Sequence, residues 1–407
     1  MSLAHVETVL MQGHIVDSLL LPKVLDAILS RGGRYHIREL VLGQKQDDTS
    51  TATIEVSAAS AVQLDSILNE IHPHGAVPAE PRDCTTAVAD IAGAFPDGFY
   101  CSTNFRTQVR RGGVWLDVQG QEMDCGIALD GDTARCLPMT AVEPGQQILV
   151  GRSGTRVFPP ESEARRGSMF EFMSSPVSSE RPKAVSVREI AKAMKAARAN
   201  GQKILAVLGP AVVHTGGAEC VVKLLRAGYI QVIFAGNALA THDMEQAFYG
   251  TSLGVSFDHG LPTDEGHEHH LRTINSIRRL GGIRGAIAAG RLKTGIMYEC
   301  EMQKVPAVLC GSIRDDGPLP EVITDALAAQ TAMRAHIPGT GFCLMVATTL
   351  HSIAVGNILP ASVKVACVDI NPATVTKLMD RGSTQTVGIV SDAEPFLQAL
   401  VAELEKA

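Results

Sequence analysis

Polar and glycine residues follow apolar segments at six places in the second half of the chain. One such segment ends in Arg314-Asp315-Asp316-Gly317, where three charges precede a backbone breaker. In a parallel α/β sheet, the carboxyl ends of the strands meet at one edge, and ligands bind there. Each motif alone could be a turn or a helix cap, but six together favour a ligand-binding crevice. The other five are Gly209-Pro210 with His214, Gly236-Asn237-Ala238, Thr348-Thr349-Leu350-His351, Asp369-Ile370-Asn371 and Ser391-Asp392-Ala393.

Asp369 is the candidate for binding the ribose of NAD. It directly follows an apolar segment, where a carboxylate is the usual acceptor for the ribose hydroxyls and disfavours the extra phosphate of NADP. No G-x-G-x-x-G fingerprint lies upstream, and IPGTGF at 337–342 has two glycines and precedes a strand. An NAD site must therefore be a variant in which helix starts hold the pyrophosphate. The residues at those starts are Thr348, Thr349 and His351, and Asp392 with Ala393.

A histidine-rich segment, FDHGLPTDEGHEHHLRTIN, follows the second of these strands. A metal site is one interpretation, because imidazoles and carboxylates are metal ligands. No cysteine joins them and the spacing does not match H-E-x-x-H, so we predict no metal and favour a polar loop that receives an anionic substrate. Arg272 and a histidine such as His270 would then bind the carboxylate. The potential metal ligands are His259, His267, His269, His270, Asp258, Asp264, Glu265 and Glu268.

The hydrophobic periodicity predicts an α/β protein with three regions. Residues 1–80 have the β-α-β-β-α pattern of a ferredoxin-like module, and residues 81–160 have the short strands of a small β-rich domain. Residues 161–185 are rich in Ser, Arg and Glu and are predicted to be a linker or covering loop. Residues 186–407 alternate strands and helices, with nearly continuous apolar strands that are typical of a doubly wound parallel sheet. Those strands are KILAVLG, QVIFAG, AVLCGS, CLMVAT, VKVACVD and TVGIVS.

Composition favours a small-molecule partner. The net charge of −7 and the absence of a basic stripe give no electrostatic footprint for nucleic acid. No apolar run reaches the roughly 18–20 residues that a membrane span needs, and the nine cysteines form no C-x-x-C pair. These features predict a soluble cytoplasmic protein with reduced thiols. Cys125, Cys300 and Cys310 are nucleophile candidates by type alone, and buried inert thiols are commoner. An edge strand in the ferredoxin-like module predicts a homo-oligomer.

Several long motifs resemble the LOR/SDH-region family, whose name refers to lysine-oxoglutarate reductase and saccharopine dehydrogenase, and whose members include NAD-dependent ornithine cyclodeaminases of the archaeal type. The resemblance covers nearly the whole chain and includes GHIVDSLLLPKVLD, FPDGFYCSTN, GPAVVHTGG, AGNALATHDME, GSIRDDGPLPEVITD and VDINPATVTKLMDRGS. It implies a Rossmann-like domain similar to the NAD-binding fold of deoxyhypusine synthase. Some relatives carry a fused arginine dihydrolase domain, which we do not expect in this chain. By motif, the implied NAD contacts are Asn237, Ala238, Asp316, Thr348, Thr349, Leu350, His351, Asp369, Asp392 and Ala393.

The resemblance implies a cyclising ammonia-lyase that converts L-ornithine to L-proline and ammonia, with NAD recycled in each turnover. Such chemistry connects ornithine and arginine catabolism to proline biosynthesis. From position we assign Asp315 to the substrate amine, His214 to proton transfer, and His270 or Arg272 to the carboxylate. One alternative is a saccharopine-type or other NAD-dependent amino-acid dehydrogenase, with net redox change. Another is a non-catalytic sensor of NAD or amino acids, which the ferredoxin-like module suggests.

Overall fold

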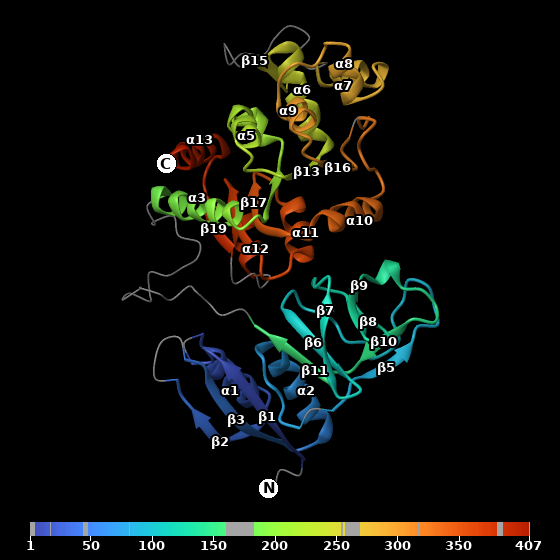
Figure 1. The fold of residues 1–407 in the computed structure, drawn as a ribbon, viewed down its shortest axis with the longest axis vertical. Helices are drawn as coiled ribbons and strands as arrows, with labels where there is room; N and C mark the ends of the chain where they lie inside the picture. The colour runs from blue at the N-terminus through green and yellow to red at the C-terminus, as the bar shows by residue number, and fades with distance from the viewer. Residues whose placement is uncertain are drawn as a thin grey trace. The chain divides into compact units, whose positions relative to one another are not determined.

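The computed structural model describes residues 5–16, 18–43, 48–80, 82–159, 183–253, 255–256, 269–315, 317–380 and 386–406. The chain forms two compact units (Figure 1). The first comprises residues 1–169 and 357–362, and the second comprises residues 170–356 and 363–407. The short segment 357–362 is held in the first unit by two backbone hydrogen bonds, from Met123 N–H to the Asn357 carbonyl and from Ala361 N–H to the Asn104 carbonyl.

The first unit begins with a four-stranded antiparallel sheet of strand order β2-β3-β1-β4. This order confirms the ferredoxin-like pattern. The buried residues Val24, Ile28, Ile67 and Ile71 lie on the two helices and share one core with the sheet. The elements are β1 (His5–Gly13), α1 (Leu20–Ser30), β2 (Arg34–Val41), β3 (Ser50–Ala58), α2 (Ala61–Ile71), the 3-10 helix η1 (His72–His74) and β4 (Val77–Pro78).

A seven-stranded sheet of order β11-β6-β7-β9-β8-β10-β5 completes the first unit. Its pairs are antiparallel except β7 with β9, and its core includes Val109, Ile127 and Leu149. The predicted β-rich character of this region is therefore confirmed. The strands are β5 (Thr85–Val88), β6 (Arg106–Arg111), β7 (Val114–Gln119), β8 (Gly126–Asp130), β9 (Thr133–Leu137), β10 (Gln147–Val150) and β11 (Thr155–Phe158), with the 3-10 helix η2 (Met139–Ala141) between β9 and β10.

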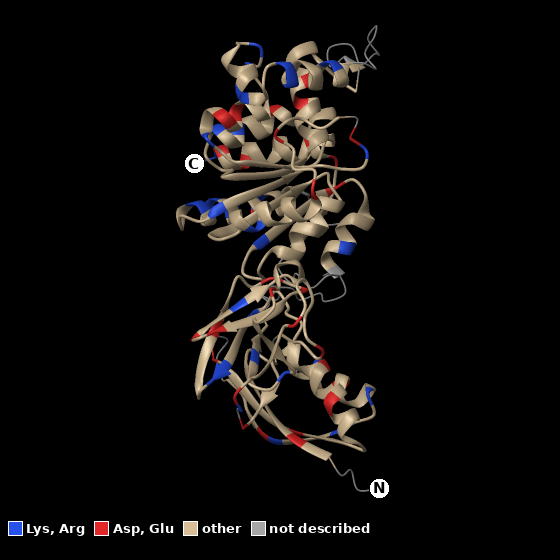
Figure 2. Cartoon of the chain, turned by 90° about the vertical axis from the view of Figure 1, so that its right-hand side faces the viewer, with Lys and Arg blue, Asp and Glu red and all other residues tan. Residues whose placement is uncertain are grey.

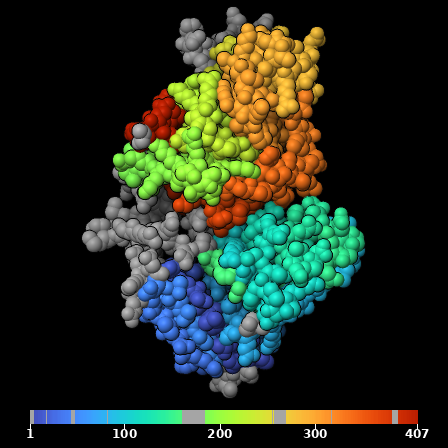
Figure 3. Space-filling view, in the orientation of Figure 1, coloured from blue at the N-terminus to red at the C-terminus, as the bar shows by residue number. Residues whose placement is uncertain are grey.

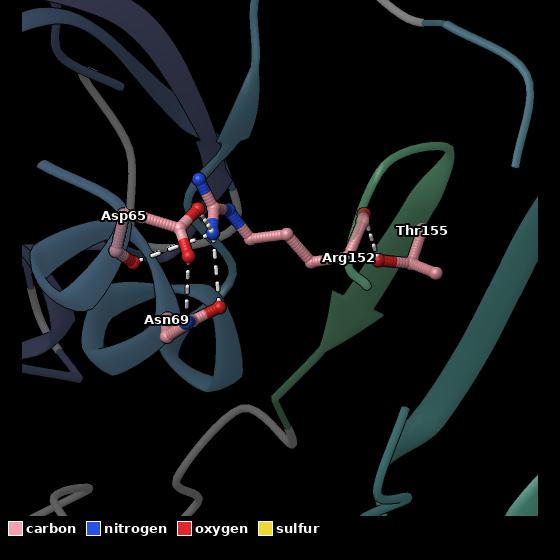
Figure 4. A network of polar contacts seen from close by, with 4 residues as sticks. All are labelled: Asp65, Asn69, Arg152 and Thr155. Atoms are coloured by element: carbon pink, nitrogen blue, oxygen red, sulfur yellow. Dashed lines mark hydrogen bonds and ion pairs between the residues drawn. The ribbon is translucent and has the colours of Figure 1, made fainter. Parts of the chain in front are cut away.

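Arg152, in the turn between β10 and β11, connects this sheet to the ferredoxin-like module (Figure 4). Its guanidinium pairs with Asp65 on α2 and donates to Asn69 Oδ1 at 2.9 Å. Nearby, the hydroxyl of Thr155 lies 3.1 Å from Nε2 of the buried His72. Burial lowers the pKa of His72 to about 4, and the Arg152 charge adds to this effect. His72 is therefore a neutral packing residue at neutral pH.

The second unit contains a six-stranded sheet in which every pair is parallel. Its order, β16-β13-β12-β17-β18-β19, is the 3-2-1-4-5-6 order of the Rossmann fold when strands are counted along the chain. All six apolar segments predicted as strands form this sheet. They are β12 (Lys203–Leu208), β13 (Val232–Gly236), β16 (Ala307–Cys310), β17 (Thr340–Val346), β18 (Lys364–Asp369) and β19 (Thr386–Val390).

Helices cover both faces of this sheet, which explains why its strands are apolar along their whole length. Figure 1 shows α5 and α13 on one side and α11 and α12 on the other, and the space-filling view in Figure 3 shows residues of α3, in green, on the surface of this unit. The helices are α3 (Lys183–Ala199), α4 (Ala211–His214), α5 (Ala218–Arg226), α6 (Asn237–Tyr249), α7 (His269–Arg279), α8 (Ile283–Ala288), α9 (Ile296–Gln303), α10 (Ala326–His336), α11 (Leu350–Ile358), α12 (Pro372–Asp380) and α13 (Ala393–Glu405). A hairpin of β14 (Thr251–Ser252) and β15 (Val255–Ser256) follows α6.

Three sequence expectations concern the chain as a whole. The linker or loop predicted for 161–185 lies outside the described residues except for 183–185, which begin α3, and the domain boundaries stay predictions. Within the described ranges, no helix combines the length and apolar character that a bilayer span requires. Figure 2 shows basic and acidic residues interspersed over both units in that view.

Candidate functional site

The strand order of the Rossmann-like sheet reverses between β12 and β17, and a close backbone approach marks this point. A Cβ added to Gly209, directly after β12, would lie 1.8 Å from the carbonyl oxygen of Ala347, directly after β17. Only glycine fits at 209. Ala347 itself has φ 54°, a left-handed conformation that is costly for a residue with a side chain. Ligands of such sheets bind in the crevice at this reversal, so the local strain coincides with the expected ligand site.

Helix α11 begins beside this crevice and contains the predicted residues Leu350 and His351, and Thr349 directly precedes it. Thr349 Oγ1 lies 2.7 Å from Thr374 Oγ1 at the start of α12, and Leu350 is exposed. His351 packs against the end of β13, because a Cβ on Gly236 would lie 3.2 Å from the ring. Thr348 precedes the helix, with its Cβ 3.0 Å from a Cβ built on Gly209.

Ser352 is a buried polar residue in the first turn of α11. Its side chain is 1% exposed, and its Oγ has no hydrogen-bond partner among the described residues. A buried hydroxyl without a partner is unfavourable, which makes this position a candidate for contact with a bound ligand. The first turn of a helix also presents free backbone N–H groups that attract anions.

Asp315 lies within electrostatic range of His351. Burial lowers the pKa of His351, and the Asp315 carboxylate partly offsets this by raising it. Asp315 Oδ2 also accepts the backbone N–H of Ser312 at 2.8 Å, which shapes the turn after β16. The structure therefore brings Asp315, His351 and Gly236 together. Asp316 lies outside the described residues.

Asn237 and Ala238 form the first turn of α6, directly after β13. The Asn237 side chain is buried, and its Oδ1 accepts the backbone N–H of Leu319 at 3.0 Å. This contact ties the start of α6 to the segment after β16. The part of Asn237 that a ligand could meet is therefore its backbone, at the positive end of the helix.

Asp369 is the last residue of β18, and Asp392 follows β19. Both residues lie at the same edge of the sheet. Asp369 is 8% exposed, and its Oδ1 accepts the N–H of Asn371 at 2.8 Å. Its backbone carbonyl accepts the N–H of Ser391. Asp392 is the N-cap of α13, with Oδ1 2.7 Å from the N–H of Ala393. The helix-cap interpretation therefore holds for Asp392, in addition to any contact with a ligand.

His214 lies at the end of α4, five residues after the crevice glycine Gly209. It is half-buried, and its Nδ1 lies 2.6 Å from the hydroxyl of Ser252 on β14. Its ring meets the ring of His242 edge-on, with centroids 4.7 Å apart. Burial lowers the pKa of His214 to about 4, and His242 contributes to this lowering.

Sequence reasoning did not single out the residues around His214. His242 and Glu245 lie on α6, with His242 Nδ1 2.8 Å from Glu245 Oε2. The other carboxylate oxygen accepts a hydrogen bond from Thr251, whose hydroxyl also lies 2.8 Å from Nδ1 of His269. The signal in the sequence was the i, i+3 spacing of a histidine and a glutamate in the AGNALATHDME motif.

The predicted carboxylate ligands His270 and Arg272 lie on α7. His270 is half-buried, with its ring 6.5 Å from that of His242, whereas Arg272 is exposed. His270 therefore lies beside the histidine cluster, which consists of His214, His242 and His269 with Glu245 and Thr251. Of the histidines considered as metal ligands, His259 and His267 lie outside the described residues, as do Asp258, Asp264, Glu265 and Glu268. The described part of the chain contains no group of three or more His, Cys, Asp or Glu arranged to hold a metal.

The family models match the chain in three consecutive parts. Residues 6–105 match the LOR/SDH bifunctional enzyme conserved region. Residues 106–187 match the first region, and residues 188–400 the Rossmann fold, of the C-terminal part of arginine dihydrolase ArgZ-like proteins. The Rossmann match agrees with the observed strand order.

Individual relatives extend this similarity over the whole chain. The ornithine cyclodeaminase of Methanothermobacter thermautotrophicus is 48% identical, covering 97% of each chain. The apo crystal structure of ArgZ, a cyanobacterial arginine dihydrolase of the ornithine-ammonia cycle, superposes with a TM-score of 0.86 at 39% identity, over 99% of this chain and 58% of ArgZ. The ternary complex of AgrE with ornithine and NAD+ matches at 40% identity with a TM-score of 0.54, also over 99% of this chain and 58% of AgrE.

Proposed function

This chain belongs to the family of LOR/SDH-region and ArgZ-like C-terminal proteins that includes the archaeal ornithine cyclodeaminases, and from that premise we propose that it is an NAD-dependent ornithine cyclodeaminase. It converts L-ornithine to L-proline and ammonia, which makes it a cyclising ammonia-lyase. The observation that carries this proposal is the 48% identity to the Methanothermobacter enzyme across 97% of both chains. The AgrE complex supports the same pairing of ornithine with NAD+ in a relative.

The residues at the carboxyl edge of the sheet fit NAD. The orphaned Oγ of Ser352 and the glycine cradle at Gly209 provide a polar contact and close backbone access. Asp369 would bind the ribose hydroxyls, because one carboxylate oxygen already shapes its loop and the other can accept from a diol. The starts of α11 and α13 would hold the pyrophosphate. The remaining proposed contacts are Asn237, Ala238, Asp316, Thr348, Thr349, Leu350, His351, Asp392 and Ala393.

NAD, when bound, supplies a hydride acceptor that returns the hydride before product release, so the overall reaction is redox-neutral. The chain's own residues bind ornithine and move its protons. Asp315 would accept a hydrogen bond from the substrate amine, and neutral His214 would exchange a proton with substrate nitrogen as ammonia leaves. His270 or Arg272 would pair with the carboxylate. The proximity of His270 to the histidine cluster supports it over Arg272.

The test is to incubate the purified protein with NAD and L-ornithine and to quantify proline, ammonia and NADH together. We expect equal amounts of proline and ammonia without accumulated NADH. Accumulated NADH without proline would instead identify an amino-acid dehydrogenase. Binding of ornithine or NAD without any product would identify a sensor.

We further propose that the protein is a cytoplasmic homo-oligomer acting between ornithine catabolism and proline formation. Strand β2 is an edge of the ferredoxin-like sheet and exposes Tyr35, Leu40 and Val41, which supports pairing with a second copy. Light scattering of the purified protein, with Val41→Lys as the variant, tests this. The division into a module at 1–80, a β-rich domain at 81–160 and a catalytic domain at 186–407 is part of the same proposal.

A further inference from the structure

Helix α6 carries a buried imidazole–carboxylate pair that the proposed reaction does not yet use. Glu245 is fully buried, and His242 is nearly so. Burying a carboxylate is costly unless hydrogen bonds and a positive partner compensate for it. Both oxygens of Glu245 are engaged, Oε2 by His242 and Oε1 by Thr251. Apolar side chains of similar volume would stabilise the fold as well as this buried pair or better, so the pair indicates a functional role.

The hydrogen-bond directions in this cluster determine which ring nitrogens carry protons. A carboxylate only accepts, so the Nδ1 of His242 must carry the hydrogen that it donates to Glu245. The Thr251 hydroxyl donates its single proton to Glu245, so it accepts from the Nδ1–H of His269. The rings of His242 and His269 are therefore both fixed through Glu245.

Strand β14 joins this cluster to His214. Its two residues are Thr251, which binds Glu245, and Ser252, whose hydroxyl lies 2.6 Å from Nδ1 of His214. The ring of His242 packs edge-on against that of His214. With Nδ1 bound to Ser252, Nε2 is the nitrogen of His214 that remains for a substrate. The same two neighbours thus hold the direction of the ring, and Nε2 has its lone pair in the tautomer in which Nδ1–H donates to Ser252.

We propose that His242 and Glu245, together with Ser252, are positioning residues that hold the imidazole of His214 so that its Nε2 exchanges a proton with the substrate. The exchange moves one proton from a substrate nitrogen to the Nε2 lone pair and later returns it, without redox change. This inference rests on the proposed function, since it requires His214 to act in turnover. His242 and Glu245 act through His214 and do not touch the substrate.

The proposal predicts coupling between Glu245 and His214 that a structural ion pair would not show. In the full-length protein with NAD bound, Glu245→Gln should lower kcat for proline formation by about 100-fold, with KM and the Kd for NAD changed by less than about threefold. In a His214→Asn background, the same substitution should change kcat by less than about twofold, because the residue through which it acts is absent. Ser252→Ala is a milder background that keeps turnover measurable.

Asp243→Asn is the matched control, because Asp243 is a buried carboxylate on the same helix that caps α9 and does not contact the histidines in the described structure. Asp243→Asn should lower Tm. The factor by which it changes kcat should be the same in the wild-type and His214→Asn backgrounds. Equal losses of kcat from Glu245→Gln in both backgrounds would overturn the inference. If Glu245→Gln does not fold, Thr251→Val removes one hydroxyl from the same cluster and must show the same dependence on His214. A wild-type protein that makes no proline would refute the proposed function itself.

Discussion

At the scale of single residues, His214 makes a prediction about pH. Burial and the neighbouring His242 lower its pKa to about 4, so the ring is neutral over most of the accessible range. Below that value it becomes protonated and can no longer accept a proton. We expect kcat for proline formation to be independent of His214 titration between about pH 5 and pH 7 and to fall as the pH approaches 4. A pH profile of kcat, with circular dichroism at each pH to verify folding, checks this.

Asp369 makes a prediction about cofactor affinity. Replacing it with Ala removes the acceptor proposed for the ribose hydroxyls, and a hydrogen bond to a charged group contributes about 1.5–3 kcal/mol. The Kd for NAD should therefore rise by about 10-fold to 100-fold. Calorimetric titration with NAD measures the change. Asp325→Ala, which removes an exposed cap on α10, is the control and should leave the Kd unchanged.

Residue types at strand ends could be predicted from the sequence, but their partners could not. Asp369, Asp392 and His351 were identifiable because each follows a continuous apolar segment. His242 and Glu245 become important only because α6 packs against α4 and because β14 turns back to contact both. A histidine and a glutamate three positions apart are common on helix surfaces, so their spacing alone does not indicate a buried pair.

At the scale of elements, helix caps with different burial should differ in their cost. Asp243 is buried and accepts the N–H groups of Ile296 and Met297 at the start of α9, whereas Asp325 is exposed and accepts one N–H on α10. Asp325→Ala should lower the free energy of unfolding by about 1 kcal/mol. Asp243→Ala leaves two buried donors unpaired and should lower it by about 3 kcal/mol. Urea unfolding of both variants tests the difference, and equal losses would contradict it.

The length of an element decided whether the sequence indicated it. The six strands of the parallel sheet were predicted because each is nearly continuously apolar: five have at least four consecutive apolar residues, and β19 has the run Val-Gly-Ile-Val. Strands β4, β14 and β15 have two residues each, which is too short for any periodicity. β14 nevertheless supplies Thr251 and Ser252 to the histidine cluster. The fold was therefore more predictable than the candidate site.

At the scale of the whole molecule, all nine cysteines are free, and their burial predicts an order of reactivity. Cys101 is exposed and Cys84 is intermediate, while the other seven are buried. Partial burial and the nearby Asp124 carboxylate raise the pKa of Cys101, so its labelling should accelerate as the pH rises above neutrality. We expect maleimide to modify Cys101 first in the native protein and all nine in urea. Peptide mass spectrometry identifies the cysteine that is modified first, and Cys101→Ser is the control. First modification of any other cysteine in the native protein would contradict the prediction.

The path of the chain through the two units has a consequence for biosynthesis. Residues 357–362 belong to the first unit, and the chain then returns to complete the second with β18, β19 and α13. Helix α3 packs against α13, and its Val187, Ile190 and Met194 share a core with Leu397 and Leu400. During translation, at about 5–20 residues per second, α3 therefore emerges long before the helix that covers it. The nascent Rossmann-like unit must stay incomplete until α13 has been synthesised, and chaperones that bind apolar nascent segments would act on α3 during this interval.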